Sequence, residues 1–307
     1  MNASRDRVDL HRVKFRGFGW KFTSLLLIYL LLAAFFNIAW RFLFHLPPQM
    51  QHGILDPGLM LLTGIILLGS ILAASAWTVH FFDHRSLGTV GVPLSRPWLQ
   101  ETLIGLLVGS IPPLLFFLAA YKLDDAQVAR VPLDLHRVLT QSLPALAATL
   151  LLAFHEELLY RGYLLQLISQ KTGRMVAALV TGAIFGLAHG GNSAANPQGL
   201  AFTAIGGVLL AWLVMRSGAL WMAGGYHAGW NVTASLVLGL NVSGTIMPGS
   251  RITTTLTGPR WISGGSYGFE SSIIAGLLEP FVLGTLLWIA PRLPSHPQLH
   301  RFFDAQP

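Results

Sequence analysis

Residues 143–168 read LPALAATLLLAFHEELLYRGYLLQLI, a mostly apolar stretch that is long enough to cross a bilayer. Inside it lie two adjacent glutamates, Glu156 and Glu157, and Arg161 follows the second at helical i, i+4 spacing. An ionised carboxylate in hydrocarbon costs about 3 kcal/mol or more unless it is paired or lines a wet cavity. The stretch therefore predicts a membrane helix that carries a functional site.

The rest of the chain has the composition of a membrane protein. Only 11% of its 307 residues are charged, 53% are hydrophobic and the mean hydropathy is +0.58. A soluble domain carries roughly 25% charged residues. We therefore predict an all-α fold, a polytopic membrane helical bundle. The chain has no cysteine, which excludes disulfides, thiolate metal sites and a cysteine nucleophile.

Apolar runs long enough to cross a bilayer predict about eight transmembrane helices. They are expected at residues 22–43, 58–81, 99–120, 137–168, 175–190, 199–215, 219–240 and 271–290. The first is too long for the apolar part of a signal peptide and lacks a convincing small-residue cleavage site, so it should remain as an anchor.

These runs divide the chain into five parts. We expect a basic N-terminal arm at 1–21, N-terminal transmembrane helices at 22–136, a catalytic core at 137–240, a long loop at 241–270, and the last helix with a short tail at 271–307. The loop is rich in Gly, Ser and Thr and is expected to act as a lid or binding element, with a short hairpin around Arg251 to Leu256.

The distribution of basic residues predicts the orientation. Six of the twenty Lys and Arg precede the first span: Arg5, Arg7, Arg12, Lys14, Arg16 and Lys21. Beside a membrane span, such a cluster indicates the cytoplasmic side rather than nucleic-acid binding. We expect a multi-pass protein of the cell (inner) membrane with both termini cytoplasmic, in contact with membrane lipids and without a nucleic-acid partner.

Two later runs each carry a histidine paired with another residue at the same i, i+4 spacing, which places both members on one helix face. They are Phe185 with His189, and His227 with Asn231. Glu156 precedes the predicted turn at 171–174 by 15 residues, and His189 follows it by 15. At about 1.5 Å per residue, both lie roughly 22 Å from that turn, at equal depth in a helical hairpin.

The small residues around these pairs let helix backbones approach closely in a bilayer. They are Gly182, Ala183, Gly186, Gly190 and Gly191 on the fifth run, and Gly224, Gly225, Ala228 and Gly229 on the seventh. We expect Glu157 to pair with Arg161 and Glu156, rotated by about 100°, to face a cavity. His155 and Tyr160 are interpreted as groups of the bundle interior. No role is assigned to His45, His52, His80, His84, His136, His300, Glu101 or Glu279.

In this order and on separate spans, the three motifs resemble those of the CAAX prenyl protease and bacteriocin-processing (CPBP or Abi) family of intramembrane proteases. The resemblance covers about 137–240, and residues 1–95 are matched only in hydropathy. It implies an eight-span intramembrane endopeptidase in which Glu156 and His189 activate water, while His227 and Asn231 stabilise the oxyanion. Glu157 and Arg161 would support them. The substrate would be a hydrophobic or membrane-tethered peptide or a small membrane protein.

The resemblance leaves the metal open, because the family has also been described as one of metalloendopeptidases. Glu156, His189 and His227 would be the ligands of a divalent metal such as zinc. However, Leu159 stands where the zinc-protease pattern H-E-x-x-H requires a second histidine. We therefore assign no cofactor.

Two other classes of function remain open. One is a non-catalytic membrane immunity or scaffold protein that binds a peptide partner in the same pocket. The other is a proton-coupled transporter with Glu156 and the histidines as a relay. The chain contains no internal repeat, so an inverted-repeat transporter has no positive support.

Overall fold

The computed structural model describes residues 17–44, 50–51, 54–94, 97–123, 125–132 and 134–292. Several residues named above lie outside these ranges: Arg5, Arg7, Arg12, Lys14 and Arg16 of the basic arm, His45, His52 and His300.

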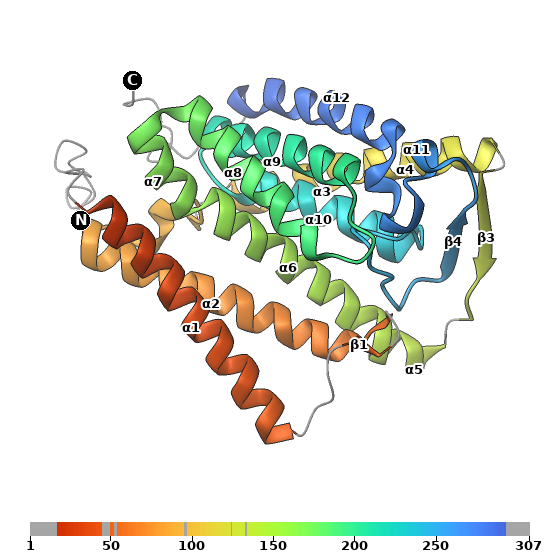
Figure 1. Ribbon diagram of the computed structural model, residues 1–307, viewed down its shortest axis with the longest axis horizontal. Coiled ribbons are helices and arrows are strands. Elements are labelled where there is room, and N and C mark those ends of the chain that lie inside the picture. Colours follow the sequence, from red (N-terminus) through yellow and green to blue (C-terminus); the bar gives the residue numbers. More distant parts are fainter. Residues whose placement is uncertain are drawn as a thin grey trace.

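The described chain is almost entirely helical (Figure 1). The helices are α1 (Phe18–Phe44), α2 (Pro57–Asp83), α3 (Trp98–Gly109), α4 (Ile111–Lys122), α5 (Leu135–Arg137), α6 (Leu143–Arg161), α7 (Tyr163–Thr172), α8 (Arg174–Ala188), α9 (Pro197–Ser217), α10 (Trp221–Val232), α11 (Arg260–Ser263) and α12 (Ile273–Ile289). Within these ranges, six helical runs are long and apolar enough to cross a membrane, and α12 is a shorter apolar helix. The predicted polytopic membrane bundle is confirmed.

One end of the bundle collects the start of α1 and the connections that follow α2, α7 and α9. The ammonium group of Lys171, at the end of α7, lies 4.9 Å from the ring centroid of Phe18. The amide of Leu220, between α9 and α10, donates to the carbonyl of Gly91, which follows α2, at 2.7 Å. The two short strands β3 and β4 lie at the opposite end (Figure 1).

The fourth predicted run is not one straight helix. A π-helical stretch, η3 (Val138–Ser142), precedes α6, and the chain breaks at Gly162 before α7. A Cβ atom at Gly162 would lie 2.2 Å from the carbonyl oxygen of Leu158, so only glycine fits there. The depth count for Glu156 assumed an unbroken helix and does not apply, because α7 leaves the axis of α6 at this break.

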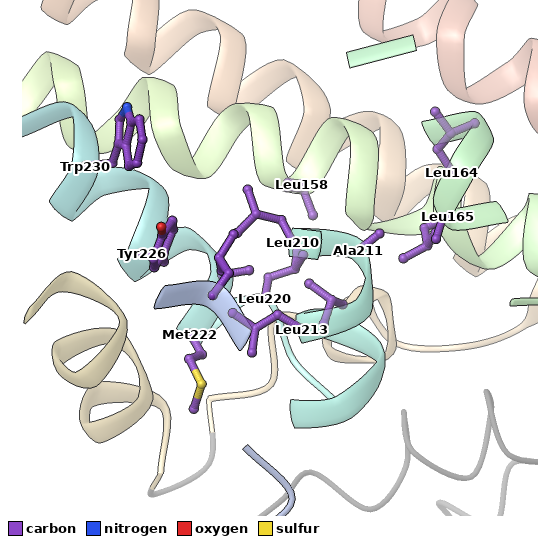
Figure 2. Packing of buried hydrophobic residues seen from close by; sticks show 14 of the residues in the cluster. Leu158, Leu164, Leu165, Leu210, Ala211, Leu213, Leu220, Met222, Tyr226 and Trp230 are labelled. Carbon is purple, nitrogen blue, oxygen red and sulfur yellow. The ribbon is translucent and has the colours of Figure 1, made fainter. Parts of the chain in front are cut away.

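The close helix approaches involve partners that the sequence did not identify. Gly225 and Gly229 of α10 pack against the backbone of α3, and an added Cβ would lie 2.2 and 2.1 Å from carbonyl oxygens of that helix. On α8, Gly182 and Gly186 pack against α9 in the same way. Figure 2 shows part of the apolar core, to which α6 contributes Leu158, α9 contributes Leu210 and α10 contributes Met222.

The predicted hairpin around Arg251 to Leu256 is wrong. Strand β4 (Ile252–Leu256) is present, but it pairs antiparallel with β3 (Ala126–Arg130), which follows α4. On its other side, the amide of Thr254 donates to the carbonyl of Gly239. The pairing of this strand therefore depends on the positions in space at which α4 and the seventh run end. A pattern within residues 251–256 contains no information about those positions. A second pair, β1 (Met50–Gln51) and β2 (Ile54–Leu55), connects α1 and α2.

Candidate active site

The two glutamates of α6 point to different surroundings. Glu157 has a side chain that is 0% exposed, and its Oε1 accepts a hydrogen bond from Nη1 of Arg161 at 3.0 Å. The side chain of Glu156 is 30% exposed and lines a cavity. A hundred-degree step between neighbouring helical residues produces this division.

His227 of α10 contacts both glutamates. Its Nδ1 lies 2.9 Å from Oε1 of Glu157, and its Nε2 lies 3.8 Å from Oε2 of Glu156. An ionised carboxylate can only accept hydrogen bonds, so Nδ1 carries the proton and donates it to Glu157. Glu157 thus joins the first motif to the third, a contact that the sequence analysis did not anticipate.

His189 lies where α8 ends. Its Nδ1 lies 2.8 Å from the carbonyl oxygen of Phe185 and donates to it, which leaves Nε2 to meet a ligand. The ring of Phe185 lies edge-on to both histidines, with centroid distances of 4.7 Å to His189 and 6.0 Å to His227. The guanidinium of Arg161 lies 4.1 Å from the same ring. Phe185 therefore fixes the positions of three polar groups.

A cavity of about 280 Å³ is lined by all four residues predicted to be catalytic, Glu156, His189, His227 and Asn231. They come from α6, the end of α8 and α10. The wall is completed by α9, α12 and the loop after α10, including Val242, Ser243, Thr245 and Met247. Its volume is close to the lower limit of about 300 Å³ for ligand pockets.

His155 and Tyr160 lie away from this cavity. The Nε2 of His155 is 2.8 Å from the hydroxyl of Tyr29 on α1, and the side chain is buried. The ring of Tyr160 packs edge-on against Phe185 at 5.2 Å. Both are groups of the bundle interior, as interpreted from the sequence.

Two cavity residues were missed. Glu270, in the loop before α12, accepts hydrogen bonds from Nε1 of Trp230 at 3.0 Å and from the amide and hydroxyl of Ser243 at 2.6 and 2.5 Å. Ser243 adopts a φ angle of +49°, a backbone conformation that residues other than glycine rarely take. Glu279 of α12 also lines the cavity. Its position inside an apolar run is the same signal that identified Glu156, and should have identified it too.

The residues do not fit a resident metal ion. Within the described ranges, no group of three or more His, Asp or Glu side chains is arranged to hold one. The interpretation as a metalloendopeptidase thus has no support from the geometry.

Fold and site together define a multi-pass membrane protein with a cavity that carries carboxylate, imidazole and amide groups. Residues 139–233, from η3 to the end of α10, match the family model described as Type II CAAX prenyl endopeptidase Rce1-like. The chain therefore carries an Rce1-like domain, and its enzyme class is that of this family, an intramembrane protease. The resemblance stated from the motifs is confirmed. No curated protein and no solved structure matches the chain.

Proposed function

We propose that the protein is an intramembrane endopeptidase that hydrolyses a peptide bond of a hydrophobic or membrane-tethered peptide. The observation that carries the proposal is that a partly exposed carboxylate, Glu156, shares one cavity with two imidazoles and an amide. The match to the Rce1-like family model over 139–233 supports the same reaction class.

Water activation falls to Glu156 and His189. Glu156 is the only one of the two motif glutamates that reaches the cavity, since Glu157 is held by Arg161. A carboxylate that takes the proton of a bound water generates the nucleophile and later returns the proton to the leaving amine. Nε2 of His189 is the nitrogen placed to hold that water, because Nδ1 bonds to Phe185.

Oxyanion stabilisation falls to His227 and Asn231, one helical turn apart on α10. The bond from Nδ1 to Glu157 orients the imidazole and favours its protonated form, in which Nε2–H donates toward the cavity. The amide NH₂ of Asn231 supplies a second donor. Donors held in place before the reaction act on the charge that develops in the transition state, often the largest contribution to catalysis.

The substrate reaches this cavity from the end of the bundle that carries the loop. Val242, Ser243, Thr245 and Met247 line the cavity, whereas Lys171 and Phe18 lie at the other end. With both termini in the cytoplasm, as the basic residues indicate, the loop faces the extracytoplasmic side.

Two substitutions test the proposal. Glu156→Ala and His189→Ala are expected to abolish processing while the protein still inserts and purifies, since neither side chain is in the packed core. The measurement compares the membrane peptidome of a deletion strain with that of strains carrying each variant. His136→Ala, at an exposed position outside the cavity, is the matched control.

Processing that persists in both variants rejects the endopeptidase. If the phenotype also depends on the 241–270 loop, that outcome identifies a peptide-binding scaffold or immunity protein. Uptake into proteoliposomes driven by a pH gradient identifies a transporter.

A further inference from the structure

Carboxyl groups outnumber cationic side chains around the cavity. Its lining among the described residues includes three carboxyl groups, those of Glu156, Glu270 and Glu279. The cation in the lining is the imidazole of His227, protonated through its bond to Glu157, and the lining contains neither lysine nor arginine. Arg161 does not line the cavity, and its Nη1 pairs with the carboxylate of Glu157. In a cleft with walls of low dielectric constant, this arrangement attracts a cation more strongly than it would in water.

Glu279 is the carboxylate without a partner. It makes no hydrogen bond or ion pair with any described residue, unlike Glu270, which accepts three hydrogen bonds. Its carboxylate packs against Gly206 of α9, where an added Cβ would lie 2.3 Å from Oε1. A carboxylate without a partner inside a membrane bundle is unfavourable, and pairing with a cation offsets the cost.

Tyr226 provides an independent indication of a ligand at the same place. The residue is 1% exposed, and its buried hydroxyl has no hydrogen-bond partner among the described residues. It lines the cavity and lies within electrostatic reach of Glu279. Buried hydroxyls are normally hydrogen-bonded. A donor placed between Tyr226 and Glu279 would give both side chains a hydrogen-bond partner.

We propose that Glu279, Tyr226 and Glu270 form a subsite that binds a basic group of the substrate peptide, an ammonium or a guanidinium. The cation donates one hydrogen bond to the carboxylate of Glu279 and one to the hydroxyl oxygen of Tyr226, while Glu270 adds negative charge. A metal ion is the poorer occupant, because the described residues offer no set of three ligands.

The subsite specifies the substrate class, and it therefore rests on the proposed function. Since it shares the cavity with Glu156, the basic group lies within a few residues of the scissile bond. The substrate is thus an apolar, membrane-associated segment that carries a lysine, an arginine or a free terminal ammonium close to the cleavage site.

The first measurement is selectivity in cleavage. Paired peptides carry Lys or Gln at each position around a cleaved bond, and the ratio of their rates is determined in detergent or liposomes. At one position we expect Lys to be preferred roughly tenfold, as for a charged hydrogen bond. Glu279→Gln should bring this ratio close to one. Asp134→Asn, which removes an exposed charge outside the cavity, should leave the ratio unchanged.

The second measurement separates binding from chemistry. Affinities of the same peptides are compared in the Glu156→Ala protein, in Glu156→Ala with Glu279→Gln, and in Glu156→Ala with Tyr226→Phe. A Lys preference that falls in both double variants supports the subsite, even if no variant cleaves any peptide, a result that would reject only the proposed function. Equal binding of Lys and Gln peptides by the Glu156→Ala protein, or a preference that survives Glu279→Gln, overturns the subsite while leaving the endopeptidase intact.

Discussion

Oε1 of Glu157 accepts two hydrogen bonds, from Nδ1 of His227 at 2.9 Å and from Nη1 of Arg161 at 3.0 Å. The second glutamate of the first motif therefore holds the imidazole of the third motif in place. A buried carboxylate that orients a histidine in this way also favours the protonated ring, the role of the aspartate in serine-protease triads. The pair joins α6 to α10 at the cavity.

Glu157→Gln is predicted to lower both stability and cleavage. It leaves the buried guanidinium of Arg161 without its counter-charge, which costs about 3–5 kcal/mol of unfolding free energy. It also removes the charge that stabilises protonated His227, so cleavage should fall roughly a hundredfold. Thermal unfolding in detergent and peptide cleavage below the unfolding temperature measure the two effects.

Arg161→Gln is the comparison for that experiment. It breaks the same ion pair but leaves the bond from His227 to Glu157 intact. Cleavage per folded molecule should therefore exceed that of Glu157→Gln. Equal losses in the two variants would show that His227 does not depend on Glu157.

Gly229→Ala is predicted to destabilise the bundle by about 1–3 kcal/mol, because the new Cβ would lie 2.1 Å from the carbonyl oxygen of Leu106 on α3. The backbone shift would also move His227 and Asn231, two residues away on either side. Gly284→Ala on α12 is the control, since nothing lies within 4 Å of its Cβ position. If both variants unfold at the same temperature, α10 does not pack closely on α3 at Gly229.

Trp230→Phe is predicted to loosen the loop that covers the cavity. The substitution removes the Nε1 donor to Glu270 and keeps an aromatic ring, so amide hydrogen exchange in 241–249 should rise about tenfold. Trp261→Phe, at a side chain that is 55% exposed, should leave exchange there unchanged. Unaltered protection in Trp230→Phe would mean that Glu270 does not hold this loop.

The absence of cysteine makes the predicted orientation directly testable with single cysteines. Ser266→Cys, exposed in the loop before α12, should react with an impermeant maleimide on intact cells. Thr172→Cys, at the turn between α7 and α8, should react only after the membrane is permeabilised. The reverse labelling pattern would place both termini outside the cytoplasm.

The positions of the helices follow from the sequence because apolar length and i, i+4 spacing are properties of one helix at a time. This is why runs such as 199–215 coincide with α9, and why the pairing of Glu157 with Arg161 is predictable from the sequence. The charge of Glu279 inside an apolar run carries the same kind of information.

What the sequence alone determined about this protein is its membrane helices and the polar motifs that they carry, since burying apolar side chains in lipid depends on local composition. Only the tertiary structure decided that Glu157 binds His227, that α10 packs on α3, that β4 pairs with β3, and that Glu270 and Glu279 reach the cavity. Each of these contacts joins segments that are far apart in the chain. The i, i+4 spacing within one helix is compatible with many different partner helices. The choice among them is made by close packing and by the need of each buried polar group for a partner.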